Sequence, residues 1–185
     1  TDMRFYISNH DQSDVHRVAF PIVGATNLTI KANGSVFVFG GKPIPFAVID
    51  SRDVTLKGFS VDSSYAFMPE LVITGFKDGK TIARMDPARH PHRVKDGRIL
   101  FSGEGWEFPV HHAKLFDGET RELVERSGDI PYKGKAEELS EDTLALEYDF
   151  SKRGQGGKIG DVVVFRPPLR PCPGVFVSGS ENTVL

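Results

Sequence analysis

A short strand motif recurs along the chain, and this repeat constrains the fold more than any other feature of the sequence. The stretch 50–62 reads DSRDVTLKGFSVD, in which apolar residues alternate with Thr, Lys and Ser as in a half-buried β-strand, with a bend at Gly58. The residues ATNLTI at 25–30 share the frame of SRDVTL at 51–56, and SENTVL at 180–185 is a looser third copy. Repeated short strands that follow an Asn or Asp turn are typical of stacked coils in a β-solenoid.

The spacing of the copies predicts an insertion between coils. Asn27 and Asp53 are separated by 26 positions (27 to 53), whereas Asp53 and Asn182 are separated by 129 (53 to 182). The second interval exceeds the first by 103 positions, which we interpret as an inserted domain. Chance similarity among strands rich in Thr and Val is the alternative interpretation. The predicted organisation is solenoid coils at 1–65, an insert at 66–168 and a return to the solenoid at 169–185.

The predicted insert consists of hairpins with charged turns. Asp-Gly pairs at 78–79, 96–97 and 117–118 lie between short apolar runs. Asp-Gly supplies the positive φ angles of a two-residue hairpin turn. The third pair predicts strands at 113–116 and 121–124, although a short helix over 119–126 is an alternative. Roughly six to eight antiparallel strands with few helices predict a small barrel or sandwich.

Composition excludes several classes of partner. The chain has 185 residues, of which 39% are hydrophobic and 26% charged, so it can build a core. A formal charge of −2 gives no signal for a nucleic-acid partner. No apolar run is long enough for a transmembrane span, and the first residues do not resemble a signal peptide. A single cysteine excludes an internal disulfide framework.

Four residues are candidates for substrate binding: Asn9, His10, Asp62 and Trp106. Asn9 and His10 belong to the polar cluster NHDQ, which forms either a sugar-binding corner or an ordinary Asx turn. Asp62 follows a strand end and faces a groove in the solenoid interpretation, whereas Asp53 caps a turn. Trp106 lies between Glu104 and Glu107 and is either a platform for stacking a sugar or part of the core.

Other catalytic and cofactor motifs are not found. The histidines at 90, 92, 111 and 112 lack the spacing of a helical zinc pair and have no neighbouring cysteine, so no metal site is predicted. The glycine-rich GQGGK at 154–158 lacks the spacing of a phosphate loop and the Ser or Thr that follows it. No Gly-x-Ser-x-Gly nucleophile elbow is present. No cofactor is therefore predicted.

Several phrases of the sequence together resemble glycoside hydrolase family 110, the α-1,3-galactosidases. They are FYISNHDQ at 5–12, HRVAFP at 16–21, LTI at 28–30 with Gly34 and Phe37, PF at 45–46, the stretch 50–62, and GVFVS at 174–178 after a proline-rich segment. The resemblance covers the chain but only an N-terminal part of a family member. It departs at 31–34, where KANG stands in place of an Asp-Gly turn.

The resemblance implies a fold and an activity. The implied fold is all-β, with right-handed parallel β-helix coils and an inserted antiparallel β-barrel. The implied activity is hydrolysis of terminal α-linked galactose with inversion, in a secreted or periplasmic protein whose partner is a galactose-containing glycan. Inversion requires one acidic and one basic carboxyl group. By resemblance we expect both beyond Leu185, so no residue here receives a catalytic role, and we expect a fragment that is inactive by itself.

Two other functions remain open at the level of sequence. The chain could be a non-catalytic glycan-binding β module, with the insert and Trp106 as the binding face. It could also be a structural β-solenoid without a ligand. Paired carboxylates on further coils would favour the enzyme over both alternatives.

Overall fold

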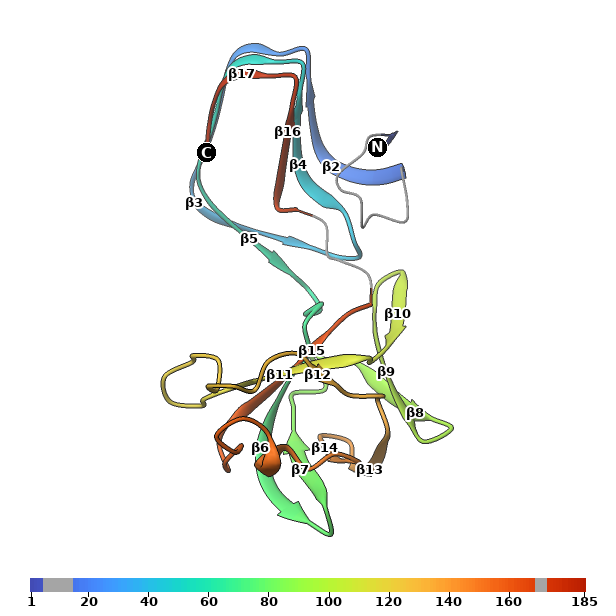
Figure 1. The fold of residues 1–185 in the computed structure, drawn as a ribbon. Coiled ribbons are helices and arrows are strands. Elements are labelled where there is room, and N and C mark those ends of the chain that lie inside the picture. Colours follow the sequence, from blue (N-terminus) through green and yellow to red (C-terminus); the bar gives the residue numbers. More distant parts are fainter. Residues whose placement is uncertain (5–14, 169–172) are drawn as a thin grey trace. The chain divides into compact units, whose positions relative to one another are not determined.

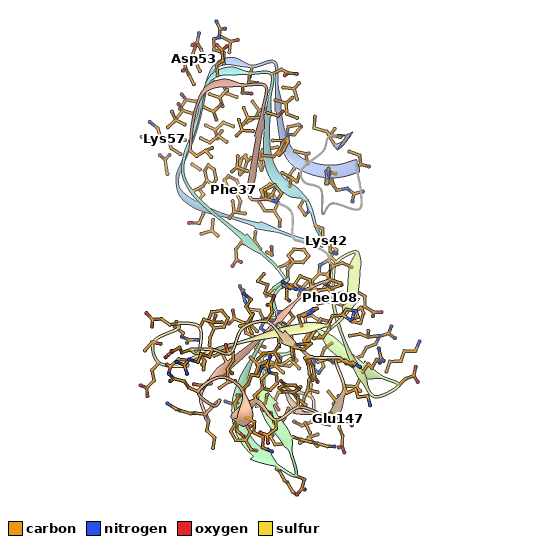
Figure 2. All side chains as sticks on the ribbon, in the orientation of Figure 1. Phe37, Lys42, Asp53, Lys57, Phe108 and Glu147 are labelled. Atoms are coloured by element: carbon orange, nitrogen blue, oxygen red, sulfur yellow. The ribbon has the colours of Figure 1, made fainter. Side chains whose placement is uncertain are left out.

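The computed structural model describes residues 1–4, 15–168 and 173–185, with the side chains of Arg4 and Val15 excepted. The described chain is all-β, with one short 3₁₀ helix, η1, at Phe150–Lys152. It forms two compact units: Thr1–Ser64 with Leu169–Leu185, and Tyr65–Pro168 (Figures 1 and 2). The candidate phrase at residues 5–12 lies outside the described residues.

The first unit contains two sheets built mainly from parallel strands. In one sheet, β2 (Val15–Val23), β4 (Ile44–Ile49) and β16 (Val175–Ser178) run parallel, and β1 (Asp2–Arg4) pairs antiparallel with β2. In the other, β3 (Thr26–Phe39), β5 (Arg52–Ser63) and β17 (Glu181–Val184) run parallel (Figure 1). In the second sheet β5, which carries the middle copy of the repeat, therefore lies between the strands that carry the other two copies.

The three copies of the repeat lie in register. One rung, meaning a row of paired residues across neighbouring strands, contains Leu28, Val54 and Thr183, although 129 positions separate the second copy from the third. Asn182 Nδ2 donates a hydrogen bond of 2.9 Å to Asp53 Oδ1. The expectation that Asp53 and Asn182 lie together beside parallel strands is confirmed.

Local chemistry explains why the third residue of each copy is Asn or Asp. Asn27, Asp53 and Asn182 have φ angles of 56°, 55° and 52°, in the left-handed region that these side chains tolerate best among non-glycine residues. Serine hydroxyls link the copies: Ala25 N donates to Ser51 Oγ, and Ser51 N donates to Ser180 Oγ, both at 3.0 Å. The corner that precedes each strand is thus held by short polar side chains.

Phenylalanine dominates the core of the first unit. Phe46 is fully buried, and its ring stacks with those of Phe20 and Phe59 at centroid distances of 4.8 Å. Val48, Val54 and other buried apolar residues complete this cluster. The alternation of apolar residues in the repeat therefore places one face of each strand in a shared core.

The second unit is antiparallel. Its seven-stranded sheet has the order β12-β11-β15-β6-β7-β14-β13, and a three-stranded sheet has the order β10-β9-β8. The strands are β6 (Glu70–Lys77), β7 (Lys80–Arg84), β8 (His92–Lys95), β9 (Arg98–Gly103), β10 (Trp106–Pro109), β11 (His112–Phe116), β12 (Ile130–Pro131), β13 (Ala136–Ser140), β14 (Thr143–Leu146) and β15 (Val162–Arg166). Its core includes the fully buried rings of Phe101, Phe150 and Phe165.

The seven-stranded sheet does not close into a barrel within the described residues. Its edge strands are β12 and β13, and one isolated bridge between Arg98 and Lys135 connects the β13 end to the smaller sheet. The prediction of an inserted barrel is therefore correct for the antiparallel β class and not for closure. Strand β12 has only two residues, the second of which is Pro131, and proline has no N–H to continue a ladder.

The Asp-Gly turns were only partly predicted correctly. Asp78-Gly79 and Asp96-Gly97 have positive φ angles at both residues and join β6 to β7 and β8 to β9, as expected. At the third pair the expected strand 121–124 is reduced to one antiparallel bridge between Leu123 and Phe116, and the alternative helix does not form. Asp117 Oδ1 accepts the N–H groups of Glu119 and Thr120 at 2.9 and 2.8 Å, so the turn is longer than a two-residue hairpin turn and only a short pairing with β11 follows it.

Candidate functional site

Asp62 lies near the end of β5 in the parallel sheet, opposite Val38 of β3. The residue is exposed, and its Oδ1 accepts the backbone N–H of Ser63 at 2.8 Å. An exposed carboxylate at a strand end can hydrogen-bond a sugar hydroxyl. The other two candidates of the first unit, Asn9 and His10, lie outside the described residues, so their assignment stays a prediction.

Trp106 lies in the core of the second unit. Only 8% of the residue is exposed, and its ring stacks with those of Phe67 and Phe108 at centroid distances of 5.0 and 5.2 Å. This placement matches the core interpretation that the sequence left open, and it leaves little of the indole surface for a sugar. Its role in sugar binding stays a prediction.

Glu107, beside Trp106, is held as a carboxylate. Arg93 Nε and Nη2 donate to its two oxygens at 3.0 and 2.8 Å, the two-point geometry that guanidinium and carboxylate groups favour. These hydrogen bonds lower the pKa of Glu107. A general acid needs a proton at neutral pH, so Glu107 is unsuited to that role.

The histidines do not assemble a metal centre within the described part of the chain. No group of three or more His, Cys, Asp or Glu residues with metal-binding geometry occurs there. His90 is 7% exposed, and burial lowers its pKa, which favours the neutral ring. In the same residues no helix has the length and apolar character needed to cross a bilayer.

A polar cleft in the second unit has no counterpart in the sequence predictions. Its volume is about 560 Å³, and it is lined by Glu70, Val72, Arg84, Met85, Asp86, Pro87, His90, Arg121, Asp142 and Val162. The floor follows one rung of the seven-stranded sheet, where Val162, Val72, Arg84 and Thr143 are successive partners across β15, β6, β7 and β14.

The cleft lies on the sheet face opposite the core. Leu71 and Ile73, which flank Val72 in β6, are fully buried, whereas 43% of Val72 is exposed. One wall is the turn after β7, where Asp86 O accepts the N–H groups of Arg89 and His90 at 3.2 and 2.9 Å. Arg121, from the turn that follows Asp117, adds a guanidinium to the lining.

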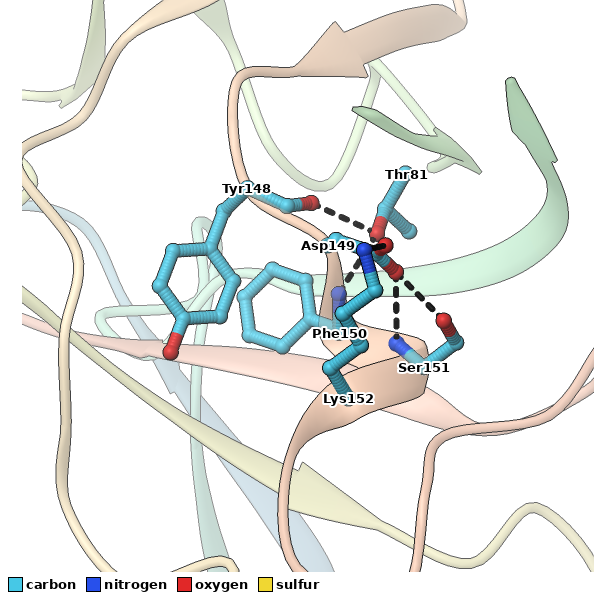
Figure 3. Close-up of polar contacts among 6 residues, drawn as sticks. All are labelled: Thr81, Tyr148, Asp149, Phe150, Ser151 and Lys152. Carbon is cyan, nitrogen blue, oxygen red and sulfur yellow. Dashed lines mark hydrogen bonds and ion pairs between the residues drawn. The ribbon is translucent and has the colours of Figure 1, made fainter. Parts of the chain in front are cut away.

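A buried polar contact fixes the end of the same sheet. Figure 3 shows the hydroxyl of Thr81 between Tyr148 and Phe150: it donates to Tyr148 O at 2.7 Å and accepts from Phe150 N at 3.0 Å. Asp149 caps η1 through Ser151 N at 3.2 Å and forms an ion pair of 2.8 Å with Lys152. These residues hold β7 against the chain after β14, and their role is structural.

Sequence patterns could not reveal the cleft because its residues come from separated strands and loops. Arg84, Asp142 and Val162 are brought together only by the strand pairing of β7, β14, β6 and β15. The one available signal was Glu70-Leu71-Val72, an alternation that places a carboxylate and an exposed valine on the same strand face.

The fold defines a class of protein: a unit of parallel strand rungs interrupted by an antiparallel β unit. Comparison with known proteins then gives the family. Residues 70–162, half of the chain, match the family model described as GLAA-B beta-barrel domain I. The chain belongs to this family. The predicted resemblance to the α-1,3-galactosidases is confirmed by relatives that carry that name.

Three such relatives illustrate the extent of the similarity. Alpha-1,3-galactosidase B of Akkermansia muciniphila is 33% identical over 184 residues, covering 100% of this chain and 23% of the relative. The enzyme of the same name from Bacteroides fragilis is 33% identical over 190 residues, covering 100% of the chain and 31% of the relative. Alpha-1,3-galactosidase A of Shewanella woodyi is 30% identical, covering 98% and 30%. The chain thus spans roughly a quarter to a third of these relatives.

Proposed function

We propose that this chain is part of a glycoside hydrolase that removes terminal α-linked galactose from glycans with inversion of the anomeric configuration. The observation that carries the proposal is the similarity to α-1,3-galactosidases along the whole chain, across both units. The substrate in this proposal is a galactose-containing carbohydrate, and the protein is secreted or periplasmic.

We further propose that the first unit is made of right-handed parallel β-helix coils at 1–65 and 169–185, and that 66–168 is an inserted β-barrel domain with an incomplete ladder. The in-register pairing of Leu28, Val54 and Thr183 supports stacked coils. The left-handed φ angles at Asp53 and Asn182 support a repeated corner between sheets.

In this proposal the catalytic carboxyl groups lie on further coils of the longer protein. Inverting hydrolysis requires an acid and a base about 6.5–9.5 Å apart, with a water molecule between them. Asp62 is exposed at the end of β5 and is the substrate-side candidate, where its carboxylate would accept a hydrogen bond from a sugar hydroxyl.

An aryl α-galactoside assay with the 185-residue chain and with a longer protein that contains it tests the proposal. We expect no turnover above the buffer rate from the chain and clear turnover from the longer protein. For a natural α-1,3-linked substrate, proton NMR should show β-galactose as the first product, because inversion changes the anomer.

Two results would contradict parts of this proposal. Turnover by the 185-residue chain that is abolished in Asp62→Asn would place the active site within these residues. A folded longer protein that leaves every α-galactoside intact would refute the assignment as a galactosidase.

A further inference from the structure

His90 gives the polar cleft a buried nitrogen without a partner. The residue lines the cleft, is 7% exposed, and its Nδ1 has no hydrogen-bond partner in the described part of the chain. A buried polar atom that lacks a partner carries an uncompensated desolvation cost. Because this nitrogen is closed off from solvent, a ligand in the cleft would supply the missing hydrogen bond only after a small movement of the lining.

The charges around the cleft are mixed and nearly balanced. Three carboxylates, of Glu70, Asp86 and Asp142, accompany the two guanidinium groups of Arg84 and Arg121. Within the described residues neither guanidinium forms an ion pair. Guanidinium groups only donate hydrogen bonds and ionised carboxylates only accept them. A ligand rich in hydroxyl groups, each of which donates and accepts, satisfies both kinds of group, whereas a strongly charged ligand meets repulsion from one of them.

Asp142 is already oriented for such a ligand. The hydroxyl groups of Ser140 and Thr143 both donate to its Oδ1, at 2.8 and 2.6 Å. Thr143 is also the rung partner of Arg84, so the acceptor and a donor of the lining start from adjacent strands. An oriented polar group loses less conformational entropy when a ligand binds.

The floor of the cleft is apolar. Val72 and Val162 are rung partners, and Val72 keeps 43% of its surface exposed. Met85 and Pro87 add further apolar surface at the wall. A pyranose ring presents C–H groups on its faces and hydroxyl groups at its rim, and this distribution matches an apolar floor between polar walls. The volume of about 560 Å³ lies within the usual range for small-ligand clefts.

We propose that the polar cleft of the second unit binds a neutral saccharide, with Arg84 and Asp142 as the principal polar contacts and Val72 beneath the sugar ring. This site lies in the second unit and takes no part in bond cleavage. It goes beyond the proposed hydrolysis and does not depend on it, because binding requires no catalytic pair.

The test is a titration of the ¹⁵N-labelled 185-residue chain followed by NMR. The probes are galactose, glucose, N-acetylglucosamine and lactose, each at about 10 mM, which fills sites with dissociation constants near ~1 mM, with sodium sulfate as the charged comparison. At least one saccharide should produce saturable shifts at the amides of Met85 and His90 and at the His90 ring nitrogens. Sulfate should leave these signals unchanged.

Variants distinguish the cleft from other surfaces. Arg84→Gln and Asp142→Asn should each weaken saccharide binding at least ~10-fold, as expected when a hydrogen bond from the ligand to a charged group is lost. The matched controls are Arg98→Gln and Asp96→Asn, because both residues are exposed and neither lines the cleft. Spectral dispersion verifies that every variant is folded. The controls should bind like the unaltered chain.

Three results would overturn the proposal. They are no shift with any saccharide, shifts with sulfate in place of saccharides, and saccharide shifts that persist unchanged in both cleft variants. None of these outcomes bears on galactoside hydrolysis by a longer protein, so the two proposals succeed or fail separately.

Discussion

Replacing Thr81 with valine should destabilise the second unit more than any conservative threonine replacement on its surface. Thr81 is fully buried, and its hydroxyl bridges Tyr148 O and Phe150 N (Figure 3). Valine fills nearly the same space, so the change removes two hydrogen bonds and leaves a partly buried carbonyl and a buried N–H without this partner. With a net loss of about 1–2 kcal/mol for each bond, we expect a destabilisation of roughly 2–4 kcal/mol.

Urea denaturation followed by tryptophan fluorescence provides the measurement. Trp106 is the single tryptophan of the chain and lies in the core of the second unit, so its emission reports on that unit. The transition of Thr81→Val should move to lower urea with an unchanged slope, because stability and not compactness is altered. Two further variants isolate the hydroxyl. Thr81→Ser keeps it and loses a methyl group, which should cost about 1 kcal/mol.

The second control is Thr74→Val, whose exposed hydroxyl forms a bond of 3.3 Å to Ile82 O. This replacement should change stability by no more than about 0.5 kcal/mol. If Thr81→Val were no more destabilised than Thr74→Val, the buried bridge would contribute nothing. If Thr81→Ser were as unstable as Thr81→Val, the effect would come from packing and not from the hydroxyl.

Three further predictions concern local contacts. Asp53→Ala loses the hydrogen bond from Asn182 and places alanine at a φ of 55°, so the first unit should lose about 1 kcal/mol of stability against thermal unfolding. An unchanged unfolding midpoint would contradict a structural role for Asp53. In Gly118→Ala the added Cβ would lie 2.0 Å from Gly160 O, so the free energy of unfolding measured in urea should fall by about 1–3 kcal/mol. In the control Gly75→Ala the added Cβ meets no atom within 4 Å, and the free energy of unfolding should be nearly unchanged. Hydrogen bonds and the ion pair with Lys152 lower the pKa of Asp149 below 3.8, so the stabilisation that this carboxylate provides is present above pH 4 and is lost as the pH falls through the folded-state pKa. Asp149→Asn should therefore reduce the loss of stability at acid pH, and a pH profile of stability identical to that of the unaltered chain would contradict this prediction.

The sequence predicted those features that depend on local chemistry or on repetition. Asn27, Asp53 and Asn182 could be aligned because each adopts a left-handed conformation at the second position of its strand, a requirement that only a few residue types meet easily. Asp78-Gly79 and Asp96-Gly97 were predictable for the same reason. In each case one or two residues determine the local backbone, so a pattern in the sequence is sufficient evidence.

Features that depend on distant pairing could not be predicted in the same way. Asp117-Gly118 has the same dipeptide as the two hairpin turns, but the side chain of Asp117 caps two backbone N–H groups, and Gly118 lies against Gly160 O, 42 positions away (118 to 160). A close approach of two backbones leaves no pattern in either segment. The polar cleft has the same origin, because Arg84 and Asp142 become neighbours only through the pairing of β7 with β14.

The insertion between the second and third copies of the repeat is compatible with their pairing for an energetic reason. Extending the connection from 26 to 129 positions adds only about 1.4 kcal/mol of loop-closure free energy, because this cost grows with the logarithm of length. The inserted residues do not remain a flexible loop, since they bury their own core around Phe101 and Phe165. That core offsets the ordering cost of the insert within the insert itself. The register of β17 on β5, including the Asn182–Asp53 hydrogen bond, therefore has to offset little more than the closure cost.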